Sequence, residues 1–217
     1  MIITKRQTAV ATDESRDPWA VSDGLLYGLC RRYPDHHNAK AVTAKMLLIG
    51  RAYAATAERG RSKGAAAASS GDEFYIRDLP RALRTSDLDT RLAALRAHQR
   101  VTDDNVRAVV QAHQALMRVL GDLTGVEKRS LASKYLHFHL PRLFFIFDGR
   151  AQRMMRVVSP SVRRRRGADW AAGDSRYESF VSAALRLRGR LEARARRQLT
   201  PRHIDRVLLA LERASRK

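Results

Sequence analysis

Residues 130–150 read SLASKYLHFHLPRLFFIFDGR, the most apolar and aromatic stretch of a strongly basic chain. With helical spacing, Ser130, Lys134 and His137 share one polar stripe that lies between apolar stripes. A helix that is apolar over most of its circumference is buried against other elements. We therefore predict a buried helix from about residue 128 to residue 140, with a lysine in its middle.

The end of this helix is set by Pro141, because its ring and its missing N–H exclude proline from a helix interior. The apolar run 143–147 that follows is typical of a protein core. It ends at Asp148, directly before Gly149, where we expect the chain to turn towards the surface. The stretch therefore offers an amine on a buried helix and a carboxylate at a turn.

The rest of the chain also has helical periodicity, and no part has the alternating pattern of a strand. A short Gly-containing connection at residues 122–126 predicts a helix-hairpin-helix element around residues 106–140. The sequence thus predicts an all-α fold, with residues 1–217 forming a single globular helical domain. The other helices are expected over residues 19–32, 38–58, 86–99, 102–121, 151–159 and 177–198, with a last one from residue 200.

The charge of the chain indicates a polyanionic partner. The net charge is +20, and the last 68 residues hold 19 lysines and arginines against 6 acidic residues. An arginine-rich genome would raise the use of arginine, but it would not unbalance the net charge. Such an excess predicts binding to DNA, RNA or an anionic membrane surface, and nucleic acid is the partner that we expect.

Several other classes of protein are excluded by composition. No stretch approaches the about 20 apolar residues of a membrane helix, and residues 1–12 lack the apolar core of a signal peptide. The single cysteine, Cys30, excludes an intramolecular disulfide and is typical of a reducing cytoplasm. On a helix His137 and His139 diverge by about 200°, so no metal site is expected. We expect a cytoplasmic bacterial monomer without a membrane partner or a cofactor.

An amine, a carboxylate and a basic surface together fit the removal of a base from DNA. The bond between base and deoxyribose breaks through a transition state with oxocarbenium character, which a nearby carboxylate stabilises. A lysine amine can attack C1′, expel the base and form a Schiff base, and a buried position favours the neutral amine that this attack needs. Lys134 and Asp148 are the candidates for these two roles.

Three segments resemble the helix-hairpin-helix DNA glycosylase superfamily, and its 8-oxoguanine glycosylase branch most closely. They are LTGV at 123–126, LASK at 131–134 and FIFDGR at 145–150. The resemblance implies a hairpin that leads into a helix with the Schiff-base lysine at Lys134, and a catalytic aspartate at Asp148. It covers residues 106–150, about a fifth of the chain.

The chain also departs from the pattern of that superfamily. The usual hairpin reads Pro-Gly-hydrophobic-Gly, and here Thr124 replaces the proline and Glu127 the second glycine. The commonest position of the lysine in the superfamily is Arg129 here, five residues before Lys134. Lys128 is a rival nucleophile, and Glu127 puts one backbone contact to phosphate in doubt.

The remaining candidate residues follow from a DNA partner. Tyr135, His137 and Phe138 are expected to form the base pocket. Candidates for phosphate contact are the hairpin and its neighbours together with a run of four arginines: Gly125, Lys128, Arg129, Arg150, Arg163, Arg164, Arg165 and Arg166.

The function expected from these residues is a DNA glycosylase that excises a flipped modified base from double-stranded DNA and leaves an abasic site. The resemblance extends to small bacterial glycosylases implicated in defence against phages, which favours a glucosylated hydroxymethylcytosine over 8-oxoguanine as the base. The alternative from another class is a basic nucleic-acid-binding protein without catalysis, in which Lys134 only contacts phosphate. A metal-dependent nuclease is disfavoured because the sequence has no cluster of carboxylates for Mg²⁺.

Overall fold

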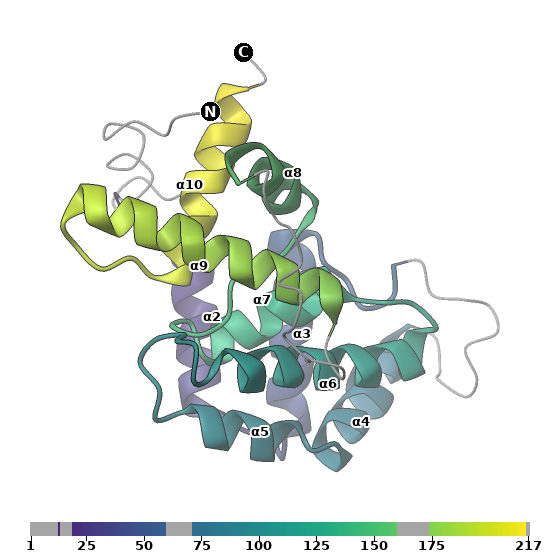
Figure 1. Ribbon diagram of the computed structural model, residues 1–217. Helices are drawn as coiled ribbons and strands as arrows, with labels where there is room; N and C mark the ends of the chain where they lie inside the picture. Colours follow the sequence, from purple (N-terminus) through teal and green to yellow (C-terminus); the bar gives the residue numbers. More distant parts are fainter. Residues whose placement is uncertain (1–12, 14–18, 60–70, 160–173, 216–217) are drawn as a thin grey trace.

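The buried helix predicted from the central stretch is α7, Arg129–His139, and every side chain from Leu131 to Phe138 on it is buried. The computed structural model describes residues 13, 19–59, 71–159 and 174–215. Figure 1 shows α7 in the middle of the fold. The predicted run of core residues follows it, since Leu143, Phe144 and Phe145 are all buried.

Three helices pack directly against α7: α2 (Ala20–Arg32), α3 (Ala39–Tyr53) and α6 (Val106–Thr124). Apolar side chains of all four helices belong to one hydrophobic core. Because α7 is covered on several sides, a polar group on it reaches solvent only through an opening between its neighbours.

The remaining elements lie around this centre (Figure 1). A second group packs together on one side of it: α8 (Gly149–Val158) contacts both α9 (Ser175–Ala195) and α10 (Pro201–Ala214). The all-α prediction is confirmed, and the described residues contain no strand. The other elements are a π-helical turn η2 (Phe74–Asp78), α4 (Leu79–Thr85) and α5 (Leu88–Leu95).

Two helix starts follow from capping side chains that the sequence displays. The Asn38 side chain accepts a hydrogen bond from Ala41 N–H at the start of α3. Thr200 and His203 form a reciprocal capping box at the start of α10, with Pro201 in the first turn. Both caps use backbone N–H groups that no helical carbonyl can reach, so they fix where each helix begins.

The predicted limits of α6 were wrong at both ends. The helix begins at Val106 and not at the Thr102 cap, because the Asn105 side chain instead accepts from Thr102 N–H and closes a turn before the helix. It passes through Gly121 and ends at Thr124, and the C-cap Gly125 has a left-handed φ of 68°. Glycine adopts that conformation without a steric penalty, so Gly125 is the helix stop. The chain then reaches α7 within residues 125–128, and α6 and α7 pack against each other.

Candidate active site

The side chain of Lys134 reaches into a cleft of about 450 Å³. The cleft lies between α7 and residues from the end of α3, the start of α8 and the face of α10. Trp19, just before α2, contributes to one wall. The cleft is therefore the opening through which the centre of the buried helix meets solvent.

The Lys134 amine is buried and held by three polar partners. Its Nζ lies 3.4 Å from Asp148 Oδ2 and donates to Ser130 Oγ at 3.2 Å and to the Tyr53 carbonyl at 3.3 Å. Only 4% of the residue is exposed. Lys134 therefore does not extend its amine to the surface, and the position of that amine is set by its partners.

Asp148 combines two roles with its two carboxylate oxygens. Its Oδ1 accepts from Arg150 N–H at 3.0 Å and from Ala151 N–H at 2.9 Å, which caps α8. Its Oδ2 faces Lys134. The structure thus brings together the amine and the carboxylate that the sequence singled out, and the cap fixes the direction of the carboxylate.

A hydroxyl that the sequence did not single out links the segment that carries Lys134 to the segment that carries Asp148. Ser133 Oγ accepts from Phe147 N–H at 3.0 Å and lies 3.1 Å from the Phe147 carbonyl oxygen. Ser133 precedes Lys134 and Phe147 precedes Asp148. This buried contact therefore sets the separation of the amine and the carboxylate.

A second carboxylate in the cleft comes from α10. Asp205 is buried and its Oδ2 accepts from Arg202 at 2.7 Å, while the same guanidinium pairs with Asp23 at 2.6 Å. Burial raises the pKa of Asp205 to about 6. The positive charge of Arg202 lowers this pKa, and the negative charge of Asp148 raises it further. The amine of Lys134 thus shares its cleft with two acids in different environments.

The aromatic side chains of the cleft are Trp19 and Tyr53. Their ring centroids are 5.5 Å apart and their planes are inclined by 31°. Lys134 Nζ lies 5.9 Å from the centre of the Tyr53 ring. Trp19 is 37% exposed, so its ring offers a surface on which a base could stack beside the amine.

The structure corrects the prediction of the base pocket. Tyr135, His137 and Phe138 are buried in the core and do not line the cleft. His137 lies on the same face of α7 as Lys134, one turn further along the helix. At that point Tyr27 of α2 covers the face. Its Nδ1–H donates to the Phe144 carbonyl at 2.8 Å and its Nε2 lies 2.8 Å from the Tyr27 hydroxyl. His137 is therefore a satisfied core group.

We expect the burial of histidines to make the fold sensitive to acid. Burial lowers the pKa of His137 to about 3 and that of His113 to about 4, so both are neutral in the folded protein near neutral pH. The unfolded chain takes up protons below about pH 6.5. Folding stability is therefore present above that pH and falls as the pH falls towards the folded pKa values. Between pH 6.5 and pH 5 the loss is roughly 2 kcal/mol per histidine.

Chemical denaturation at pH 7 and pH 5 measures this loss. His137→Gln removes one titrating group, so the difference in unfolding free energy between the two pH values should shrink by roughly 2 kcal/mol. The matched control is His98→Gln, since His98 is exposed and should leave the difference unchanged. A His137→Gln protein that keeps the full difference would show that another group causes the acid sensitivity.

The described residues among the predicted phosphate contacts are either exposed or occupied by internal partners. Arg150 is exposed and lines the cleft, and Gly125 is exposed at the end of α6. Lys128 is buried, and its amine donates to the Arg59 carbonyl. Arg129 pairs with Asp174 at 2.6 Å and with Glu127 at 2.7 Å. Internal partners thus occupy Lys128 and Arg129. The arginines at 163–166 lie outside the described residues.

Two further properties concern the part of the chain that the structure describes. It contains no group of three His, Cys, Asp or Glu side chains that could hold a metal ion. Its helices are too short or too polar to cross a bilayer.

No protein-family model, curated protein or solved structure matches the chain. The resemblance to the glycosylase superfamily thus remains an interpretation of three short segments of the sequence.

Proposed function

We propose that the chain is a DNA glycosylase, which removes a flipped modified base from double-stranded DNA and leaves an abasic site. The observation that carries the proposal is the position of the Lys134 amine. It is buried in a cleft, 3.4 Å from Asp148 Oδ2 and beside two aromatic rings. This is the pairing of nucleophile and carboxylate that cleavage of an N-glycosidic bond requires.

The reaction assigns a separate task to each group. Asp148 Oδ2 takes a proton from the Lys134 ammonium, and the neutral amine then attacks C1′ of the flipped nucleotide. The electron pair of the N-glycosidic bond leaves with the base, which takes up the proton that Asp148 received from Lys134. The carboxylate of Asp148 that this transfer restores faces the positive charge that develops on the sugar and stabilises it. The covalent product, after loss of the amine proton and opening of the sugar ring, is a Schiff base on Lys134.

The burial of Lys134 favours an enzyme over a protein that only binds nucleic acid. A lysine that contacts phosphate presents its amine on the surface, where solvent and the DNA backbone reach it. Lys134 is 4% exposed and paired with a carboxylate, so a phosphate there would meet the charge of Asp148. The amine is accessible only to a group that enters the cleft, as a flipped nucleotide does.

Charge at the mouth of the cleft fits a DNA strand. Arg150 and Arg153 line the cleft from the first turns of α8, and both are exposed. Arg153 also lies 3.5 Å from Glu212 of α10, and its side chain is 60% exposed. With a net charge of +20 on the chain, these groups are suited to hold the phosphates on either side of the flipped nucleotide.

The shape of the cleft supports a hypermodified cytosine as the substrate over 8-oxoguanine. A pocket for a flat purine would clamp it between two aromatic faces, but Trp19 and Tyr53 already contact each other. The remaining wall is polar and includes Asp205, Arg202 and Ser130. A volume of about 450 Å³ falls within the range of small-molecule sites. A glucosylated hydroxymethylcytosine can use both the aromatic face and the polar wall.

The substrate is tested by incubating the protein with two DNAs, glucosylated phage DNA and a duplex that contains 8-oxoguanine. We expect abasic sites in the glucosylated DNA and few in the oxidised duplex. Unmodified phage DNA of the same sequence is the control, because it separates base recognition from general damage. Abasic sites in the oxidised duplex alone would overturn the proposed substrate but would still support a DNA glycosylase. Abasic sites in neither DNA would count against both.

A further inference from the structure

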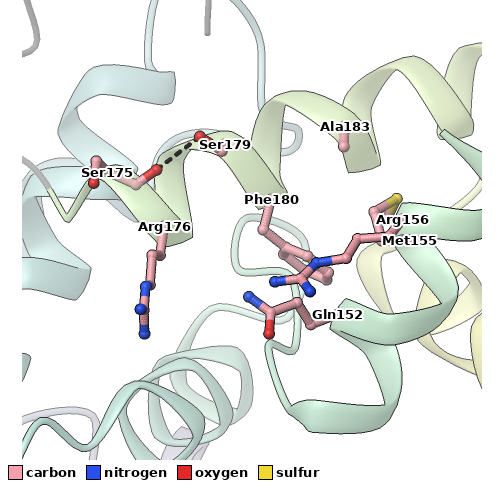
Figure 2. Close-up of a pocket in the computed structure, with 8 residues that line it drawn as sticks. All are labelled: Gln152, Met155, Arg156, Ser175, Arg176, Ser179, Phe180 and Ala183. Atoms are coloured by element: carbon pink, nitrogen blue, oxygen red, sulfur yellow. Dashed lines mark hydrogen bonds between the residues drawn. The ribbon is translucent and has the colours of Figure 1, made fainter. Parts of the chain in front are cut away.

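A second hollow lies between α8 and α9, separate from the cleft of Lys134. It has a volume of about 290 Å³, and Figure 2 shows the side chains that surround it. The Arg156 guanidinium and the Gln152 amide point into the same space in front of Phe180, while Arg176 flanks that space from the first turn of α9. No acidic side chain is among the described residues that line this hollow.

The side chains of this groove form two complementary parts. The buried Phe180 and Met155 make an apolar floor. Two guanidinium groups and an amide stand above that floor, and guanidinium groups bind phosphate oxygens in a bidentate manner. A ligand that fills the groove therefore needs a flat apolar part and a phosphate, and 290 Å³ suits one nucleotide better than a larger ligand.

Helix α8 connects this groove to the cleft. Gly149, Arg150 and Arg153 face the cleft, whereas Gln152 and Arg156 face the groove. At 3.6 residues per turn these two sets occupy neighbouring faces of the helix. Arg153 and Arg156 are three residues apart, so their side chains are neighbours and form a continuous basic edge. A strand that enters the cleft can follow this edge into the groove.

We propose that the groove between α8 and α9 binds one nucleotide of the nucleic-acid strand, with its phosphate between Arg156 and Arg176 and its base or sugar on Phe180. The inference rests on the proposed function only in taking a DNA strand as the ligand. It assigns a subsite beyond the flipped base, at a site that holds no residue of the Lys134 cleft.

Binding to an unmodified labelled duplex, measured over a range of salt concentrations, tests this subsite without any base excision. The double variant Arg156→Gln/Arg176→Gln should weaken binding about tenfold or more, because charge-assisted bonds to a phosphate are lost. The slope of log K against log salt should fall by about one, the value for one phosphate contact. The control variant Arg81→Gln/Arg84→Gln removes the same charge from α4, where both residues are exposed, and should keep the slope.

Competition with small ligands identifies what the groove holds. Thymidine 5′-monophosphate should displace the duplex from the wild type better than inorganic phosphate or thymidine, since it has both a phosphate and an apolar part. Equal competition by inorganic phosphate would overturn the role of the Phe180 floor.

Two outcomes would overturn the subsite. The first is a slope that is unchanged in the Arg156→Gln/Arg176→Gln protein, or one that falls equally in the control. The second is an Arg156→Gln/Arg176→Gln protein that binds thymidine 5′-monophosphate more weakly than the wild type but binds the duplex equally well. That result would make the groove a site for free nucleotides. Abasic sites scored with the wild type report on the glycosylase separately, so the two proposals fail independently.

Discussion

Replacing Lys134 with alanine should abolish base release while DNA binding stays nearly intact. The Lys134 amine lies 3.4 Å from Asp148. Among the described residues that line the cleft, Lys134 is the one lysine. Loss of a catalytic nucleophile costs up to about 10⁶-fold in rate, so we expect a fall of at least about 10³-fold. Single-turnover release of the base, with DNA affinity measured in parallel, gives the comparison.

Two controls separate the amine from its structural contacts. Lys134→Met keeps the apolar stem in its buried place and should be equally inactive, which excludes a packing defect as the cause. Lys128→Ala removes the neighbouring amine, whose partner is the Arg59 carbonyl, and should leave the rate of base release nearly unchanged. Full activity in Lys134→Met would instead favour Lys128 as the nucleophile.

The second large effect is expected for Asp148→Asn. Asparagine is as good a helix cap as aspartate, so the bonds from Arg150 and Ala151 to Oδ1 should persist and stability should change little. What the substitution removes is the negative charge that faces Lys134 and the developing cation. The rate of base release should therefore fall by at least about 10²-fold.

Asp148→Ala is the matched variant, because it removes both the charge and the cap. It should lose the same catalytic rate as Asp148→Asn and, in addition, about 1 kcal/mol of folding stability from the start of α8. Thermal unfolding of the two variants shows this difference. If Asp148→Asn lowers the rate of base release less than tenfold, Asp148 caps α8 and has no catalytic role.

The helices were predictable where the sequence shows both a long amphipathic stripe and a capping side chain. The ends of α3 and α9 were not, and the predictions overshot to residues 58 and 198. The two helices end in the left-handed conformation at Ala54 (φ 50°) and Arg196 (φ 51°). Neither residue type signals such a stop, because residues other than glycine and asparagine seldom adopt this conformation.

The pair at the centre of the site was predictable because its two members are only 14 positions apart along the chain. The segment after Pro141 runs back along α7, and the Ser133 hydroxyl fastens it there. Trp19 reaches the cleft from just before α2 and Tyr53 from the end of α3, so no local motif could place them.

Asp205 was missed because the sequence holds only a weak signal for it. It lies at the edge of the apolar stripe of α10, about 100° round the helix from Ile204, and the structure buries it together with that stripe. A buried acid indicates either an ion pair or a functional site, and here the partner of Asp205 is Arg202.

Mass spectrometry of the bases released from a panel of modified cellular and phage DNAs tests the central claim most directly. The account predicts that the wild type releases one modified base as a free molecule, that abasic sites appear in equal number, and that Lys134→Met releases none. Release of the same base by the Lys134→Met protein, or no release from any DNA that the wild type binds, would contradict it.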